Sequence, residues 1–169
     1  MKEARKIAYC GMTAALSIVM MVIGSIAGLG MYAAPMFAGL LVAPIGQQLG
    51  RKYHVLIWLV VSMLSFMLIA NPEQNLMYLC LFGCYPIIWP LFMRIKSPKM
   101  QLLAKLAFFN VVVIALEALI VLVLVPEVMT AAMAVILILL GNIMFVMYDF
   151  MVPRADVLVK KLLGRIKKK

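Results

Sequence analysis

The chain has 169 residues, of which 67% are hydrophobic and 13% are charged, and its formal net charge is +10. A typical soluble domain is about 45–50% apolar, and a chain of this length cannot hide so much apolar surface from water. The composition therefore excludes an ordinary soluble domain and indicates one compact membrane unit. Because the surrounding medium is lipid, the positive charge is interpreted through its position along the chain, and no nucleic-acid partner is expected.

Six apolar segments approach the length of about 20 residues that a bilayer-spanning helix needs. They are residues 7–29, 32–46, 53–70, 76–93, 102–125 and 130–152. The second is short and contains two prolines, and two more prolines interrupt the fourth, which is tolerated where other helices or water satisfy the freed carbonyls. We predict an all-α integral membrane protein with a six-helix transmembrane domain (1–153) and a basic cytoplasmic tail (154–169).

The basic residues indicate how the predicted spans are oriented. All 16 Lys and Arg lie before the first span, between the second and third, between the fourth and fifth, or after the sixth, with Lys105 one turn further into the fifth. The opposite connections contain no positive charge. By the positive-inside rule, both termini are cytoplasmic and the number of spans is even, in a multi-pass protein of the cell (inner) membrane. The basic tail is interpreted as a topological anchor that needs no partner, and the alternative is a helix that lies on the anionic inner surface of the membrane.

Glu117 stands inside the apolar run "FFNVVVIALEALIVLVLVP" (108–126). A charge at the bilayer centre costs about 2.5 kcal/mol or more, and acidic residues there usually face a bundle interior or a cavity. Counted from residue 102, Glu117 lies about 22 Å along its helix, in the outer half of the membrane. No Lys or Arg lies on that side. Glu117 is predicted either to meet a ligand from outside, such as an amine or a hydrogen-bonding ring, or to be a protonated residue bonded to a neighbouring helix.

Four further side chains are candidates for ligand binding. Asn110 and Asn142 lie at comparable depth in the inner half, where Asn commonly joins membrane helices by hydrogen bonds, so helix cross-linking is the favoured interpretation for them. Tyr85 lies near mid-depth and Tyr78 nearer the outer surface. With Trp89, these tyrosines either line a pocket or pack in the core.

Catalytic and metal-binding motifs are missing from the sequence, so we predict no enzyme, no cofactor and no metal site. There is one histidine, and no zinc-protease, nucleophile-elbow or Walker motif. Cys80 and Cys84 are spaced along one helix face rather than as a redox or zinc pair. Asp149, near the cytoplasmic end of the sixth span, is expected to pair with Arg154 or Lys6.

Small residues recur at four-residue spacing in the first span. Gly11 and Ala15 lie in its cytoplasmic half, flanked by Ala8 and Ala14. Small side chains at this spacing let two helices approach closely. Such a face most often packs within its own chain, and it can also receive another membrane protein.

With its length, its six predicted spans and the opening "KIAYCGMTAALSIVMMVIGS", the chain resembles the substrate-binding S components of energy-coupling factor (ECF) transporters. The resemblance implies a membrane protein without its own ATPase that captures a vitamin, a related micronutrient or a metal from outside. It also implies docking on a transmembrane T subunit that carries two ATPase subunits. The implied docking face consists of Ala8, Gly11, Ala14 and Ala15.

The same resemblance implies a ligand in the outer half, where Glu117, Tyr78 and the connection 71–75 fall. The sequence contains no signature for riboflavin, thiamine, biotin, folate or nickel, and no histidine-rich outer pocket that would favour a metal. The expected partners are a small-molecule solute, membrane lipid and the T and ATPase subunits. The alternative is a six-span cell-envelope scaffold similar to rod-shape-determining membrane proteins, in which Glu117 is structural. A third class, a lipid- or isoprenoid-modifying enzyme, would need acidic or polar groups clustered at one membrane face, and the sequence does not show such a cluster.

Overall fold

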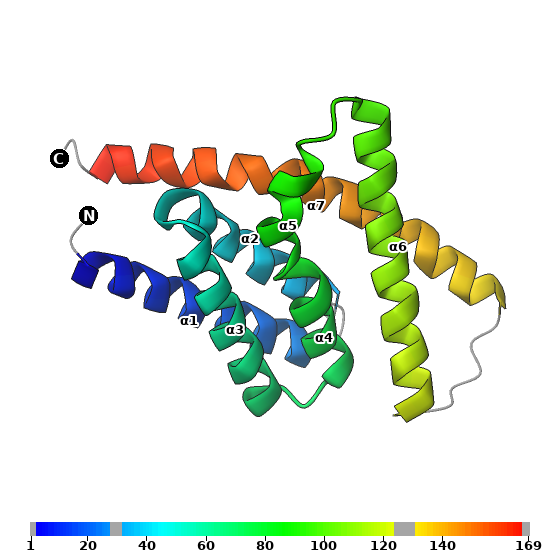
Figure 1. Ribbon diagram of the computed structural model, residues 1–169. Helices are drawn as coiled ribbons and strands as arrows, with labels where there is room; N and C mark the ends of the chain where they lie inside the picture. Colours follow the sequence, from blue (N-terminus) through cyan, green and yellow to red (C-terminus); the bar gives the residue numbers. More distant parts are fainter. Residues whose placement is uncertain (1–2, 28–31, 124–130, 167–169) are drawn as a thin grey trace.

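The structure is a computed structural model that describes residues 3–27, 32–123 and 131–166. Within these ranges every element is helical, which confirms the all-α fold class (Figure 1). The elements are α1 (Glu3–Ala27), α2 (Ala33–Leu49), α3 (Arg51–Leu68), α4 (Pro72–Met77), η1 (Tyr78–Phe82), α5 (Tyr85–Phe92), α6 (Pro98–Val123) and α7 (Ala131–Ile166). The short η1 is π-helical.

Several of these helices suit a multi-pass membrane protein. Five segments are long and apolar enough to cross a membrane: Glu3–Ile26, Arg51–Leu68, Pro72–Phe92, Pro98–Ile120 and Ile138–Ala155. The sixth apolar helix, α2, has only 17 residues. Large apolar side chains such as Ile26, Met63 and Ile143 lie exposed on α1, α3 and α7. Lipid would cover such a surface, whereas a soluble monomer rarely exposes it.

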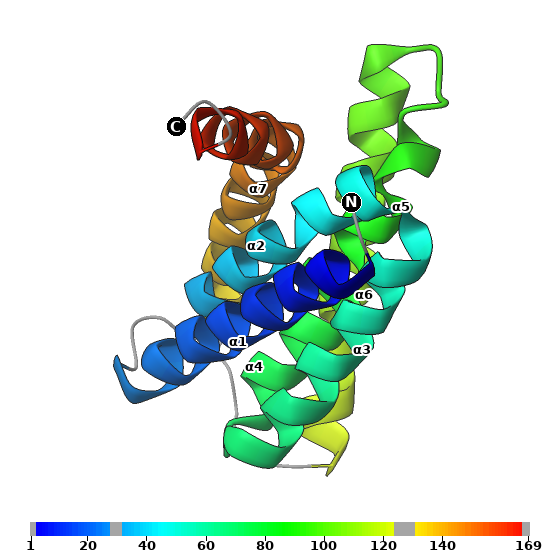
Figure 2. The same cartoon turned by 90° about the vertical axis from the view of Figure 1, so that its left-hand side faces the viewer.

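The short helix α2 lies at the centre of the arrangement. It packs against α1, α3 and α7, and Figure 2 shows it between α1 and α7. Its side chains Ala38, Val42, Ala43 and Ile45 are fully or almost fully buried. A helix that is apolar on all sides is stable only inside a larger assembly of helices. The first turns of α1 and the last turns of α7 lie at the same side of Figure 1.

Two clusters of buried side chains form the core. One joins α1, α2, α3 and η1 around Met21 and Tyr78. The other joins α2, η1, α5, α6 and α7 around Tyr85, Phe145 and Tyr148. In the second cluster the rings of Tyr85 and Phe145 pack edge to face, with centroids 4.9 Å apart. Aromatic pairs prefer this geometry because the positive edge of one ring meets the negative face of the other.

The fourth predicted span is interrupted by a π-helical turn. The N–H of Gly83 donates to Tyr78 O at 2.8 Å, five residues back, rather than to Leu79 O as in an α-helix. The indole N–H of Trp58 on α3 donates to the released Leu79 O at 3.0 Å. A side chain from a neighbouring helix therefore satisfies the carbonyl that the turn exposes, as the membrane interior requires.

Pro86 extends the interruption on the other side of this turn. Proline has no N–H, so Pro86 cannot bond to Phe82 O four residues earlier. The hydroxyl of Tyr148 on α7 donates to that carbonyl at 2.5 Å. The backbone of α2 approaches the same place, because a Cβ added at Gly39 would contact Phe82 O and would lie 2.6 Å from the Tyr148 hydroxyl. The interrupted backbone around Phe82 is thus contacted both by α7 and by α2.

The junction between α2 and α3 and the end of α7 each differ from the boundaries predicted from the sequence. Gly50 joins α2 to α3 as a single residue with φ +100°, a conformation that side-chain-bearing residues adopt only with strain. At the other end of the chain, α7 continues past Pro153 as far as Ile166. The part of the predicted tail that the structure describes is therefore helical and continuous with the last helix.

Candidate functional site

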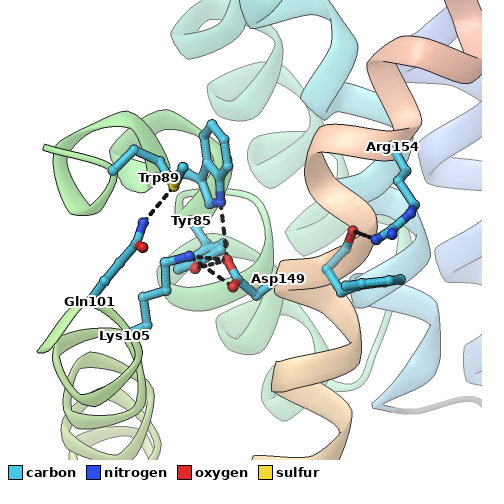
Figure 3. Close-up of polar contacts among 8 residues, drawn as sticks. Tyr85, Trp89, Gln101, Lys105, Asp149 and Arg154 are labelled. Atoms are coloured by element: carbon cyan, nitrogen blue, oxygen red, sulfur yellow. Dashed lines mark hydrogen bonds and ion pairs between the residues drawn. The ribbon is translucent and has the colours of Figure 1, made fainter. Parts of the chain in front are cut away.

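A buried charged network joins α5, α6 and α7 (Figure 3). Lys105 Nζ on α6 lies 2.9 and 2.8 Å from the two carboxylate oxygens of Asp149 on α7. From α5, Tyr85 OH at 2.5 Å and the Trp89 indole N–H at 3.0 Å donate to the same Oδ1. The Lys105 side chain is 7% exposed and that of Asp149 19%. Buried charges are tolerated when they are paired and hydrogen-bonded, and both conditions hold here.

This network corrects the expectation that Asp149 pairs with Arg154 or Lys6. Arg154 donates instead to Phe150 O at 2.9 Å, and Lys6 pairs with Glu3 at 2.6 Å. Residues five apart lie about 140° apart around an α-helix with 3.6 residues per turn. The Arg154 side chain therefore leaves α7 in a different direction from Asp149.

Lys105 was missed as a partner because it was grouped with the basic residues at the cytoplasmic junction. It lies more than one turn after the start of α6 at Pro98, and only 6% of the residue is exposed. A lone Lys and a lone Asp in apolar spans are each unfavourable in lipid. The desolvation cost of each charge is therefore the feature of the sequence that indicates an ion pair between Lys105 and Asp149.

Asn110 and Asn142 bind each other across α6 and α7. Each amide donates to the other's side-chain oxygen, at 2.9 and 3.0 Å. Each also donates to the carbonyl four residues earlier, Leu106 O at 2.8 Å and Ile138 O at 2.7 Å. Because both amides are already engaged, the geometry supports the helix cross-linking interpretation. Ligand binding by these two residues stays a prediction.

An aromatic contact lies between the charged network and the paired amides. The rings of Phe109 on α6 and Phe145 on α7 are stacked with centroids 4.7 Å apart. A Cβ added at Gly141 would lie 3.2 Å from Phe109 Cζ, so a small residue at this position lets the ring approach α7. The order of contacts runs in opposite directions along the two helices. The polar pairs on both sides of the aromatic contact therefore define where α6 and α7 cross (Figure 1).

Three buried side chains of α4 and η1 carry oxygens without a hydrogen-bond partner among the described residues. They are Gln74 Oε1, Asn75 Oδ1 and Tyr78 OH, and at most 1% of each residue is exposed. An unsatisfied buried polar group costs about 1–3 kcal/mol. The same holds for one more described atom, His54 Nε2 on α3. The first three lie within two turns of continuous helix and are the strongest candidates for contact with a ligand.

Only Tyr78 of these three was predicted individually. Gln74 and Asn75 fell within the predicted outer connection 71–75, which is largely helical because α4 begins at Pro72. The other predicted aromatic residue, Tyr85, lies in the core and uses its hydroxyl to bind Asp149. The two tyrosines thus differ, since one hydroxyl is engaged and the other is unpartnered within the described chain.

We expect Tyr78→Phe to leave the thermal stability of the ligand-free protein unchanged or slightly higher. The hydroxyl that it removes has no partner among the described residues. Tyr148→Phe is the matched control, because it removes the donor to Phe82 O and leaves a buried carbonyl unpaired, at a cost of about 1–3 kcal/mol. Thermal unfolding of both purified variants in detergent compares them. An equal loss in the two variants would contradict the different roles of the hydroxyls.

Glu117 is half-buried on α6. Its helix packs against α4, which carries Glu73. The Tyr32 hydroxyl donates to Glu73 Oε1. No hydrogen bond joins Glu117 to another residue within the described ranges. The described helices therefore do not supply the hydrogen-bonding partner that the structural interpretation of Glu117 requires.

The small residues of α1 are mostly on the surface. Ala8, Gly11 and Ala15 are exposed, whereas Ala14 faces the core. A Cβ added at Gly11 would meet no atom within 4 Å. Three of the four predicted docking residues thus form an open strip on α1 rather than an internal contact.

No cluster of three or more His, Cys, Asp or Glu side chains is placed to hold a metal ion in the part of the chain that the structure describes. Two polar features of the described chain support an argument about function. One is the set of hydrogen-bonded side chains around Asp149, and the other is the set of buried side-chain oxygens of α4 and η1 that have no partner among the described residues. Comparison with models of known protein families, with curated proteins and with solved structures finds no match to this chain.

Proposed function

We propose that the chain is the solute-capturing subunit of an ECF-type vitamin or micronutrient uptake transporter in a bacterial inner membrane. The observation that carries the proposal is the interrupted run of helix α4–η1–α5, in which Gln74, Asn75 and Tyr78 have buried polar atoms with no partner among the described residues. Interrupted helices with polar groups at membrane depth are typical of solute sites in membrane transporters. The π-helical turn η1 adds to this argument, because such turns occur frequently at functional sites.

We propose further that the chain spans the membrane six times, with α2 as the short span and both termini in the cytoplasm. The distribution of Lys and Arg supports this topology. The positions of α3 and α6 support it: in Figure 1 the α5–α6 connection and the start of α3 lie above the other ends of these two helices. The α3–α4 connection and the last described turn of α6 lie at the bottom.

Uptake driven by ATP requires partner subunits, because the sequence contains no Walker motif. The test is affinity purification of the tagged protein from its native membrane under mild conditions, followed by mass spectrometry of proteins and small molecules. Recovery of a T protein with two ATPase subunits would support the transporter. Recovery of cell-wall synthesis proteins without ATPases would support the scaffold alternative and would refute the transporter.

Gly11→Leu is expected to abolish recovery of the T and ATPase subunits while leaving solute binding unchanged. The added side chain would start from the open strip on α1, where a Cβ meets no atom within 4 Å, and it would block close approach of a partner helix. Met12→Leu is the control, because Met12 is exposed one position away and the change conserves volume. Co-purification with each variant measures the effect. An intact complex with Gly11→Leu would remove the docking face from α1.

A further inference from the structure

Three consecutive residues in the first turn of α4 carry acceptor oxygens and contact three different parts of the bundle. Glu73 accepts the Tyr32 hydroxyl beside α2. Gln74 Nε2 donates to Met21 O on α1 at 2.7 Å. Asn75 Nδ2 donates to Ile69 O, at the end of α3, at 2.9 Å. The turn therefore lies against α1, the start of α2 and the end of α3.

The contacts of the two amides determine which of their atoms remain unpartnered. A backbone carbonyl accepts only from the NH₂ end of an amide, so the bonds to Met21 O and Ile69 O define how Gln74 and Asn75 are oriented. The unpartnered atoms are then Gln74 Oε1 and Asn75 Oδ1, which can accept hydrogen bonds but cannot donate them. A solute that satisfies them must bring N–H or O–H donors.

The start of a helix ordinarily favours an anion, but here its backbone N–H groups are largely engaged. Asn71 Oδ1 accepts the Gln74 N–H at 3.1 Å, and Asn71 O accepts the Asn75 N–H at 3.3 Å. Pro72 has no N–H. The Glu73 carboxyl group occupies the first turn, where it already complements the helix dipole. An anionic solute would therefore meet acceptors rather than donors.

The carboxyl groups of α4 and α6 favour a cationic solute. Glu73 on α4 and Glu117 on α6 are both half-buried, and α4 packs against α6. No Lys or Arg occurs in residues 7–50, 53–93 or 106–153, so no positive charge of these segments offsets the two carboxyl groups. In a medium of low dielectric constant, uncompensated carboxylates attract a cation much more strongly than in water.

We propose, on the basis of the proposed solute capture, that the solute is a cation rich in N–H donors, of the amine or amino-heterocycle class. Gln74 Oε1 and Asn75 Oδ1 accept its N–H groups, and Glu73 and Glu117 balance its charge. Tyr32 holds the Glu73 carboxyl group in place through its hydroxyl. This assignment adds Glu73, Gln74 and Asn75 to the residues predicted to contact the ligand.

The test uses the full-length protein in lipid nanodiscs. Mass spectrometry identifies any retained solute, and calorimetry measures the binding of thiamine and pyridoxamine as cationic probes. Biotin and pantothenate serve as anionic probes, and riboflavin serves as a neutral probe. We expect the retained solute or the binding probe to be a cation. Glu73→Gln and Gln74→Met should each weaken its binding about tenfold or more, as expected for the loss of one hydrogen bond to a charged group.

Glu3→Gln is the matched control, because it neutralises an exposed carboxylate on the first turn of α1 and should leave affinity unchanged. Glu73 is only half-buried, so Glu73→Gln remains informative if Gln74→Met fails to fold. Binding of an anion, or of a cation with unchanged affinity in Glu73→Gln, would overturn the proposed ligand class or its site while leaving solute capture intact. Absence of any retained solute and of binding by all probes would overturn both proposals.

Discussion

Asp149→Leu should destabilise the protein by about 3–5 kcal/mol, the usual cost of removing one partner from a buried ion pair. The change leaves the Lys105 ammonium group, whose side chain is 7% exposed, without a counter-charge. It also removes the acceptor of the Tyr85 hydroxyl and the Trp89 indole N–H. Three donors that now converge on one carboxylate would be left inside the bundle, and α5, α6 and α7 would lose one of the contacts that join them.

Reversible unfolding of the purified protein in mixed micelles of dodecyl maltoside and sodium dodecyl sulfate measures this loss. The double variant Lys105→Met and Asp149→Leu is the decisive comparison. It removes both charges, and replacing a buried ion pair by apolar side chains is often neutral or stabilising, so the part of the loss that comes from the unpaired charge should return. The Tyr85 hydroxyl and the Trp89 indole N–H still lack their acceptor, so the double variant should remain less stable than the parent. If the double variant were as unstable as the single one, the loss would come from packing and not from the unpaired charge. Glu3→Gln, at an exposed pair, should change stability little.

Gly39→Ala should cost about 1–3 kcal/mol, the usual cost of overpacking a well-packed core. The new Cβ would overlap Phe82 O and would lie 2.9 Å from the Phe82 carbonyl carbon. These are backbone atoms of the interrupted segment and cannot swing aside as a flexible side chain would. The same Cβ would lie 2.6 Å from the Tyr148 hydroxyl, so the substitution also disturbs the bond that satisfies Phe82 O.

Gly11→Ala is the matched control for this prediction. Gly11 also lies inside a helix, but a Cβ there meets no atom within 4 Å. Alanine is favoured over glycine within a helix by up to about 1 kcal/mol, so this variant should be as stable as the parent or more stable. Unfolding of the two alanine variants under identical conditions compares them. Equal stability would show that α2 does not approach the fourth segment as closely as the structure places it.

The helices themselves could be predicted because each is a long apolar run that ends at charges, glycine or proline. The predicted segment 53–70 corresponds to α3 (Arg51–Leu68), and 102–125 corresponds to α6 (Pro98–Val123). The interruption of the fourth segment was also foreseen from its prolines. The exact place of the break was not, because the break begins at the π-helical turn ahead of Pro86, and that turn depends on Trp58 and Tyr148 from other helices.

Among the candidate site residues, the sequence identified which polar side chains lie in apolar segments, since each such residue carries a recognisable desolvation cost. Glu117, Tyr78, Tyr85, Asn110 and Asn142 were found in this way. Their partners could not be deduced. Asn110 with Asn142, and Lys105 with Asp149, are pairs between α6 and α7 whose formation depends on the register of two helices. Hydropathy carries no information about that register.

The sequence by itself determined the class of the protein, the approximate positions of its long helices and the uneven distribution of its positive charge, because these follow from local hydrophobicity and from residue order. Tertiary structure alone decided which polar groups are satisfied. It engages Tyr85 with Asp149 and leaves Tyr78 OH, Gln74 Oε1 and Asn75 Oδ1 unpartnered within the described chain. The physical reason is that a hydrogen bond depends on the position of two atoms in space, and residues far apart in the sequence supply most of those atoms here.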